Sequence, residues 1–294
     1  MRIFVTGASG WIGSATVREL VDAGHDVAGL VRSDVGAEIV AALGADVVRG
    51  DITDLDGLRR AAAASDGVVH LAYHHDFSQM AEAAVMDRNA IDVLGEALAG
   101  TGAPFVIASG VLGLAQGRPG TERDLPDPAT HPRVANAQAT LDFAARGVRS
   151  IVVRFAPTVH GAGDHGFVAR LVEIACETGV SGYVGDGSNR WPAVHRFDAA
   201  ALVRLAVEDA PAGAVLHAVA EEGVPAREIA EAIGRNLDLP VESVAAEHFG
   251  WLGPFFAADV PTSNELTREL LGWKPTHPGL IEDLDAGSYF TDQR

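Results

Sequence analysis

The chain has 294 residues, and its 48% apolar content is ample for the packed core of one large domain or of two closely associated ones. Its 40 acidic and 22 basic residues give a formal charge of −18, which disfavours nucleic acid and anionic membranes as partners. The single cysteine, Cys176, excludes a disulfide or a thiolate metal cluster within the chain, and its place in an apolar helical pattern predicts an inert core residue.

The first thirteen residues predict a buried strand that runs into a phosphate-binding turn. Apolar residues 3–5 lead into the sequence TGASGWIG. Gly7 allows a tight turn, Gly10 leaves room where a pyrophosphate would touch the backbone, and Gly13 lets the next helix pack close to the strand. The helix that follows would point its first amide groups at the anion.

A lone glycine triplet is a weak signal, but its surroundings support it. Residues 14–23 have helical spacing, Gly24 ends this helix, and a second strand follows over 27–31. The opening unit therefore predicts a bound dinucleotide. The N-terminus leads directly into a strand, and no apolar run approaches the length of a membrane span, so we expect a cytoplasmic protein.

Strands and helices continue to alternate, which predicts a doubly wound, Rossmann-type α/β fold with helices on both faces of a parallel sheet. The further strands expected are 46–49, 68–72, 105–108, 150–155 and 215–219. A further helix is expected to end at Ala64, with Thr53 or Asp56 as its cap. Three more helices are expected, over 79–99, from 198 onward and over 225–237.

Two parts of the chain differ in regularity. We expect residues 1–156, joined by 197–220, to form the dinucleotide-binding core. Residues 157–196 and 221–294 contain turn-rich segments and most of the aromatic residues, and we expect them to form a smaller C-terminal lobe. The cleft between the two parts should hold a small-molecule substrate.

The chain resembles the extended short-chain dehydrogenase/reductase superfamily, and more closely its atypical members of the NAD-dependent epimerase/dehydratase type. The resemblance covers nearly the whole chain and is carried by motifs in this order: TGASGWIG, GDITD, VVHLA, DRNAIDVLGEAL, FVIASG, VVRFAPTVHG and RWPAVHRFDAA. It implies a nicotinamide cofactor across the carboxyl ends of the first six strands, where ligands of such sheets gather.

The resemblance also implies which residues contact that cofactor. The pyrophosphate would be held by the turn residues Gly7, Ser9, Gly10, Trp11, Ile12 and Gly13. Asp51 and Ile52 would contact the adenine, and Pro157 and Val159 would fix the nicotinamide carboxamide. The ribose side would be lined by residues that end the fourth and fifth strands, namely Leu71, Ala72, Tyr73 and Ser109.

The end of the second strand bears on the choice of cofactor. An NAD site usually has an acidic side chain there, whereas a 2'-phosphate favours an arginine. The chain has Arg32 and Ser33, with Asp34 one step later. We predict NADP(H), because a guanidinium fork matches a phosphate; NAD(H) is the alternative, with Asp34 as the reader of the ribose and Arg32 an ordinary solvated side chain.

The chain departs from the superfamily in its catalytic residues. The usual catalyst is a tyrosine with a lysine four residues later. The chain's tyrosines are Tyr73, Tyr183 and Tyr289, the residues four positions on are Phe77, Gly187 and Gln293, and the only lysine is Lys274. The usual serine is also in doubt, since FVIASG can be aligned with either Ser109 or Gly110 in its place.

Other groups must then stabilise a forming alkoxide, and our candidates are Ser109, Arg133, Asn136 and Tyr73. The alternatives are that Ser109 holds the end of its strand and that Arg133 is solvated. His160, Tyr183, His195 and Trp191 are candidates for contact with the substrate. The alternatives are that the aromatic residues belong to the core of the lobe and that His195 braces the junction of the two lobes. His70 is expected to be a core residue, and no metal site is expected.

We therefore predict an NADPH-dependent reductase that transfers hydride to a C=O or C=N group of a small, partly apolar substrate. Two alternatives are a non-catalytic NADP(H) sensor resembling NmrA-like regulators, and a sugar-type epimerase or dehydratase. The second would need a basic clamp for a diphosphate, and the lobe offers only the scattered arginines Arg170, Arg190, Arg196, Arg227 and Arg235. A homodimer through the long mid-chain helices is usual for the superfamily.

Overall fold

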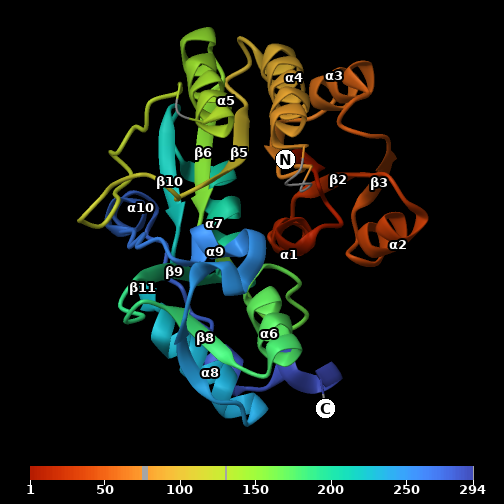
Figure 1. Cartoon of the computed structure of the whole chain (residues 1–294). Coiled ribbons are helices and arrows are strands. Elements are labelled where there is room, and N and C mark those ends of the chain that lie inside the picture. Colours follow the sequence, from red (N-terminus) through yellow and green to blue (C-terminus); the bar gives the residue numbers. More distant parts are fainter. Residues whose placement is uncertain (75–78, 130, 294) are drawn as a thin grey trace.

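The computed structural model describes residues 1–74, 79–129 and 131–293. Its larger part is built on a seven-stranded sheet in the order β10-β6-β5-β4-β1-β2-β3, with every neighbouring pair parallel (Figure 1). The strands are β1 (Arg2–Thr6), β2 (Asp26–Val31), β3 (Asp46–Arg49), β4 (Gly67–His70), β5 (Pro104–Gly110), β6 (Arg149–Phe155) and β10 (Ala214–Ala218). This strand order confirms the predicted doubly wound α/β fold.

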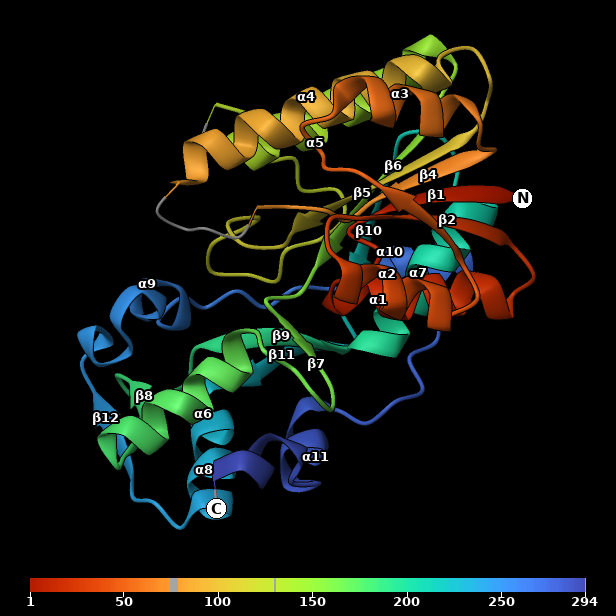
Figure 2. The ribbon, with the colours of Figure 1, turned by 90° about the vertical axis from the view of Figure 1, so that its right-hand side faces the viewer.

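Helices cover both faces of this sheet (Figure 2). One layer contains α1 (Trp11–Asp22), α2 (Asp34–Ala42) and α7 (Arg196–Asp209). The other contains α3 (Leu55–Ala63), α4 (Met80–Leu98) and α5 (Pro132–Asp142), with the short helix η2 (Phe143–Arg146) after it. Because side chains alternate along a strand, Val5 packs under the first layer and Phe4 under the second.

The smaller lobe has its own apolar core, which contains the fully buried Trp191 and Phe256. One small sheet joins β7 (Thr158–His160), β9 (Arg190–His195) and β11 (Glu221–Pro225), and a second pairs β8 (Ser181–Val184) with β12 (Val241–Val244). Its helices are α6 (Phe167–Thr178), α8 (Ala226–Leu237), η3 (Ala246–Leu252), α9 (Gly253–Phe256), α11 (Leu280–Asp285) and η4 (Ser288–Gln293). By contrast, α10 (Glu265–Leu271) and the buried Trp273 return to the large sheet, α10 against β10.

Two local predictions are wrong. Cys176 is exposed, because the buried face of α6 is formed by Val168, Leu171, Val172, Ile174 and Ala175, and the thiol lies beyond the edge of that face. Helix α3 is capped by Asp54, whose carboxylate accepts a hydrogen bond of 2.9 Å from the Gly57 amide, and not by Thr53 or Asp56. In the part of the chain that the structure describes, no helix is both long and apolar enough to cross a membrane.

Candidate functional site

The phosphate-binding turn lies where β1 ends and α1 begins. Gly7 has a φ of +68°, and a Cβ there would come within 2.8 Å of the Ala72 amide nitrogen; a Cβ at Gly13 would lie only 1.9 Å from the Gly7 carbonyl oxygen. Both positions therefore require glycine, for a left-handed turn and for close packing of helix on strand.

The N-terminus of α1 is left without a capping side chain. Gly10 is the N-cap residue and makes no side-chain capping hydrogen bond, and no acidic residue lies in the first turn. Helices α2 and α3 differ, since Ser33 and Asp54 cap them. The first amides of α1 are thus available for an anion, and together with the positive end of the helix dipole they suit a pyrophosphate.

Four charged side chains gather where β2 and β3 end. Arg32 lies 3.7 Å from Asp51, while Arg49 forms a close ion pair with Asp34. Burial alone would raise the pKa of Asp51, but hydrogen bonds from Thr53 and the nearby Arg32 charge lower it below its ordinary value. Asp34 is thus engaged by Arg49, and Asp51 and Arg32 face each other where the adenosine half of a dinucleotide is expected.

A buried chain of hydrogen bonds links the end of β1 to α4 and α5. The Thr6 hydroxyl lies 2.7 Å from His70 Nδ1, and His70 Nε2 lies 3.1 Å from Asp87. Burial would raise the pKa of Asp87, but hydrogen bonds from His70 and Asn136 lower it, so Asp87 is a carboxylate. His70 is a satisfied core residue, as predicted. Asp87 was missed, although its position on the apolar face of DRNAIDVLGEAL is a signal for a buried acid.

Asn136 is a member of this chain and does not face a substrate. It is 4% exposed, and its side-chain amide donates to Asp87 (2.7 Å) and to the Ala84 carbonyl (3.0 Å). Both amide hydrogens are used inside the protein, so the prediction that Asn136 stabilises an alkoxide does not fit the structure.

Tyr73 and Arg133 meet at the carboxyl end of the sheet, beside the end of β5, where Ser109 lies. The Arg133 guanidinium lies over the Tyr73 ring, 4.1 Å from its centroid, and one of its amino groups is 3.4 Å from the Ala108 carbonyl. Ser109 points to the same face of the sheet as Phe105 and Ile107, which pack against the α4 and α5 layer. Burial raises the pKa of Tyr73, although the Arg133 charge opposes that shift.

The segment after β6 lies against the phosphate-binding turn. The Trp11 indole donates a 2.7 Å hydrogen bond to the Val159 carbonyl. Arg196 stacks on the Trp11 ring, with its guanidinium 3.8 Å from the ring centre, and donates to the Ser14 hydroxyl at 2.9 Å. Pro157 and Val159 are both partly exposed. Arg196 was not predicted to take part; only its place in RWPAVHRFDAA hinted at it.

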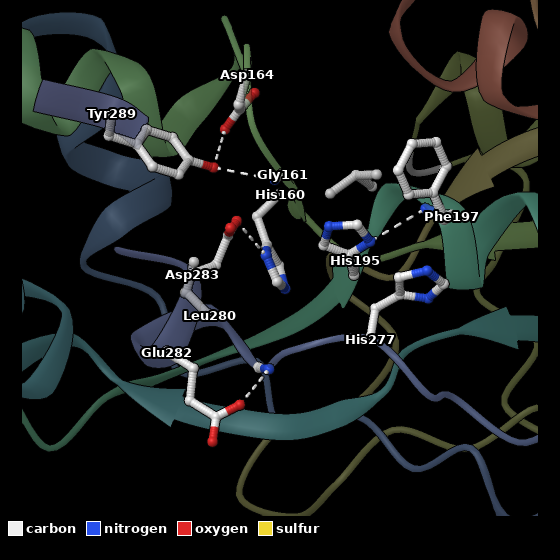
Figure 3. Close-up of polar contacts among 12 residues, drawn as sticks. His160, Gly161, Asp164, His195, Phe197, His277, Leu280, Glu282, Asp283 and Tyr289 are labelled. Atoms are coloured by element: carbon white, nitrogen blue, oxygen red, sulfur yellow. Dashed lines mark hydrogen bonds and ion pairs between the residues drawn. The ribbon is translucent and has the colours of Figure 1, made fainter. Parts of the chain in front are cut away.

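The residues predicted to contact the substrate are mostly buried. Figure 3 shows His160 against Asp283, with His195 beside it. His160 Nδ1 lies 2.9 Å from the Asp283 carboxylate, and His160 and His195 are 0% and 8% exposed. His195 caps α7 through a 3.3 Å hydrogen bond from the Phe197 amide, which supports the bracing role. Burial, with the charges of His160 and His277, lowers the pKa of His195 to about 4.

Tyr183 and Trp191 belong to the lobe core. Trp191 is 0% exposed, and its indole donates to the Phe255 carbonyl at 3.1 Å. Tyr183 is 7% exposed, and Arg227 donates to its hydroxyl at 2.6 Å. A substrate could reach neither ring without displacing the core, so the alternative of a core role holds for both. Among the described residues, no group of three His, Cys, Asp or Glu side chains could hold a metal ion.

The arginines of the lobe do not converge. Arg190 is bidentate to Asp259 at 2.9 and 3.0 Å, Arg235 binds Asp285, and Arg170 binds Glu173 and Glu177. Arg227 is engaged by Tyr183, and Arg196 by Trp11 and Ser14. Each guanidinium is held by a different internal partner, so these five side chains form no diphosphate clamp.

Comparison with known proteins adds relatives along the whole chain. A model of the NAD dependent epimerase/dehydratase family matches residues 3–231. The uncharacterized protein C2A9.02 of Schizosaccharomyces pombe is 50% identical, over 99% of this chain and 100% of its own length. The uncharacterized protein YLL056C of Saccharomyces cerevisiae is 42% identical, over 97% of this chain and 98% of its own length.

More distant proteins share the same architecture. A 3-diazoavenalumate denitrifying reductase from a Streptomyces species is 29% identical, over 97% of this chain and 99% of its own length. Among solved structures, a UDP-glucose 4-epimerase of Thermotoga maritima, with UDP-glucose, superposes with a TM-score of 0.79 at 21% identity, covering 100% of this chain and 99% of that chain. This superposition supports the fold.

Proposed function

The chain belongs to the NAD-dependent epimerase/dehydratase family, and from this premise we propose that it is an NADPH-dependent reductase of small carbonyl or imine compounds. The observation that carries the proposal is the contact between Tyr73 and Arg133, because it lies at the carboxyl end of the sheet, beside the end of β5 where Ser109 lies, and offers hydrogen-bond donors without a tyrosine–lysine pair. Relatives that are reductases support the same class of reaction.

The residues present fit a nicotinamide dinucleotide. The uncapped N-terminus of α1, with Gly7, Gly10 and Gly13 around it, would hold the pyrophosphate. Ser9, Trp11 and Ile12 belong to the same turn. The adenosine half would lie toward Asp51 and Ile52, the ribose toward Leu71 and Ala72, and the nicotinamide toward Pro157 and Val159.

The charges beside β2 favour the phosphorylated form of the cofactor. Asp34, the acid that would read the ribose hydroxyls of NAD, is paired with Arg49. Arg32 is 75% exposed and only loosely paired with Asp51, so its guanidinium is free to turn toward a 2'-phosphate, with Ser33 beside it. We therefore expect NADPH to bind more tightly than NADH, and Arg32→Ala to reduce that preference; a preference that survives this change would contradict the assignment.

In this reaction the protein would orient the substrate and stabilise the negative charge that develops on it. A bound reduced dinucleotide supplies the hydride. The negative charge that then develops on the substrate oxygen would be met by N–H groups of Arg133 and by the hydroxyls of Ser109 and Tyr73. Because burial raises the pKa of Tyr73, its phenol keeps its proton and serves as a donor, and water can complete the proton transfer.

A nucleotide-sugar epimerase is less well supported. That reaction would need a cationic site for the diphosphate in the smaller lobe, and its arginines are held by separate internal partners. An open surface near Ser109 is lined mainly by apolar side chains, among them Leu112, Leu125 and Val134, which suits an uncharged and partly apolar substrate.

The test combines binding with turnover. Calorimetric titration should show that NADPH binds, and incubation with aldehydes, ketones and imines should consume it, followed by the absorbance of the reduced nicotinamide. Binding without consumption of NADPH by any compound class would replace the reductase with the sensor alternative. If neither nicotinamide dinucleotide binds at millimolar concentration, the dinucleotide site itself is refuted.

A further inference from the structure

The C-terminal tail, defined here as residues 280–290, packs against the segment that follows β6. This segment, residues 157–164, leaves the large sheet, forms β7 and turns into α6. Figure 3 shows Tyr289 and Asp283 of the tail pointing at Gly161, Asp164 and His160 of the segment. Residues more than a hundred positions apart in the chain thus meet beside the expected nicotinamide site.

The Tyr289 hydroxyl makes two hydrogen bonds to the segment. It donates to Asp164 at 2.9 Å and accepts from the Gly161 amide at 3.2 Å. Burial raises the pKa of Asp164 and also that of Tyr289, so both groups are withdrawn from water. One phenolic oxygen therefore satisfies a backbone amide and a largely buried carboxyl group.

Asp283 makes the second connection. Its carboxylate lies 2.9 Å from His160 Nδ1, and Asp283 and His160 are both buried residues, at 8% and 0% exposure. The helix that carries Asp283 is itself fixed, because Leu280 and Leu284 pack in the lobe core and the Leu280 amide donates to Glu221 at 2.7 Å. His160 is the last residue of β7, so this contact sets the end of that strand.

The opposite side of the segment is attached to the phosphate-binding turn. Trp11 donates to the Val159 carbonyl, two residues before Gly161, and Arg196 stacks on the Trp11 ring. The side chain of Arg196 also lies against Gly161, where an added Cβ would come within 3.2 Å of it. The segment is therefore held between the turn that would bind the pyrophosphate and the C-terminal tail.

We propose that the tail is part of the cofactor site, with Tyr289 and Asp283 as positioning residues that fix segment 157–164 against the nicotinamide half of the dinucleotide. The inference rests on the proposed function, since it assumes that a dinucleotide binds and that Pro157 and Val159 contact its nicotinamide. It adds that the affinity for the nicotinamide half depends on residues at the far end of the chain. The adenosine half, bound by residues 7–13 and 32–52, does not depend on them.

Two ligands separate the halves: NADPH, and 2'-phospho-ADP-ribose, which lacks only the nicotinamide. Both are titrated calorimetrically into the full-length protein and its Tyr289→Phe variant. We expect Tyr289→Phe to weaken NADPH binding about tenfold, the size of a lost buried hydrogen bond, and to change the affinity for 2'-phospho-ADP-ribose by less than about twofold. Asp283→Asn should act in the same direction.

Tyr183→Phe is the matched control, because it removes a bonded tyrosine hydroxyl from the same lobe without touching the segment. It should leave both affinities unchanged. Tyr289→Phe retains the ring, and thermal unfolding with each variant ensures that titrations are made on folded protein. The fluorescence emission of NADPH in the presence of the protein gives a second readout. Only in the Tyr289 and Asp283 variants should this emission shift toward the emission of free NADPH.

Three results would overturn the inference. If Tyr289→Phe leaves NADPH binding unchanged, the tail does not position the segment. If both ligands weaken equally, the effect reaches the whole fold and is not specific to the nicotinamide half. If the wild-type protein binds 2'-phospho-ADP-ribose as tightly as NADPH, segment 157–164 contributes no affinity for the nicotinamide, and the tail has no such contribution to support. The proposed function fails as well only if the wild-type protein binds neither ligand.

Discussion

Arg133 would replace the tyrosine–lysine pair of the superfamily, but it differs from that pair in how it can affect proton transfer. A lysine next to a tyrosine lowers the phenol pKa and makes it a proton-transfer group. An arginine remains charged at all relevant pH values and cannot donate its proton, but it presents several N–H groups in a fixed plane. Its position on the Tyr73 ring holds that plane at the edge of the sheet. The site is therefore suited to stabilising charge.

This reasoning predicts that Arg133→Ala lowers kcat/KM for NADPH-dependent reduction about 100-fold, the typical effect of removing one preorganised donor. Tyr73→Phe and Ser109→Ala should each cost less, about tenfold. Arg60→Ala, at an exposed arginine of α3, is the control for loss of a positive charge and should change kcat/KM by less than about twofold. A loss under threefold in all three site variants would show that the donor lies elsewhere.

A second residue-scale prediction concerns Asp87. Asp87→Asn replaces a carboxylate that receives hydrogen bonds from His70 and Asn136, and it leaves one buried donor without an acceptor. We expect the free energy of unfolding to fall by about 2 kcal/mol, measured by urea denaturation. Asp92→Asn makes the same change on the same helix at an exposed ion pair with Arg88, and should cost less than about 0.5 kcal/mol. Equal losses in the two variants would refute the buried network.

Single side chains were the hardest feature to predict from the sequence. Tyr183 and Trp191 looked like pocket residues because aromatic rings serve cores and pockets alike, and only the packing of α6 and α8 decides between the two. Asn136 lies on a predicted helix, but its partner Asp87 is 49 positions away, and no local pattern reports such a pairing. His70 was predictable because it lies inside an apolar strand, where a polar ring must be satisfied.

The strand–turn–helix unit at the N-terminus is the element from which the most could be inferred. Glycines are required at positions 7 and 13 by contacts within a dozen residues, or with residues 71–72 just after β4, so most of the reason for the geometry lies in the local sequence pattern. The other strands were predicted within a few residues, for example 150–155 against Arg149–Phe155. The smaller lobe was harder to predict from the sequence, because its short strands pair with distant segments. No repeated sequence pattern indicates the pairing of β8 with β12.

At this scale we predict that Gly13→Ala disrupts the unit. The new methyl group would lie 1.9 Å from the Gly7 carbonyl oxygen, so backbone must move, and we expect a loss of about 3 kcal/mol or more together with loss of dinucleotide binding. Gly110→Ala is the matched control, since nothing lies within 4 Å of an added Cβ there; thermal unfolding and NADPH titration should change little. A stable Gly13→Ala protein with normal affinity would contradict the packing described.

At the scale of the whole molecule, buried neutral histidines make stability depend on pH. Burial lowers the pKa of His217 to about 4, as it does for His195. In the unfolded chain a histidine titrates near about 6.5. As the pH falls from about 6.5 toward 4, the unfolded state therefore binds protons that the folded state does not, and the free energy of unfolding decreases.

His217→Gln should weaken this dependence. The free energy of unfolding is measured by urea at several pH values, and the variant should lose less stability than the wild type between about pH 6.5 and 4, by an amount on the order of 1–3 kcal/mol. His25→Gln, at a partly buried ion pair with Glu208, serves as the comparison. Identical slopes for wild type and His217→Gln would mean that the pKa of His217 is the same in the folded and the unfolded protein.

The seventh strand of the large sheet has a consequence for how the protein is made. β10 covers the outer side of β6, and α7 covers α1, yet both come from residues 196–218, after β7, α6, β8 and β9. A ribosome would thus release the first 156 residues with one flank of their apolar core still uncovered. Such long-range pairings slow folding and expose growing chains to aggregation, so a nascent or truncated N-terminal half should depend on chaperones until about residue 218 has emerged.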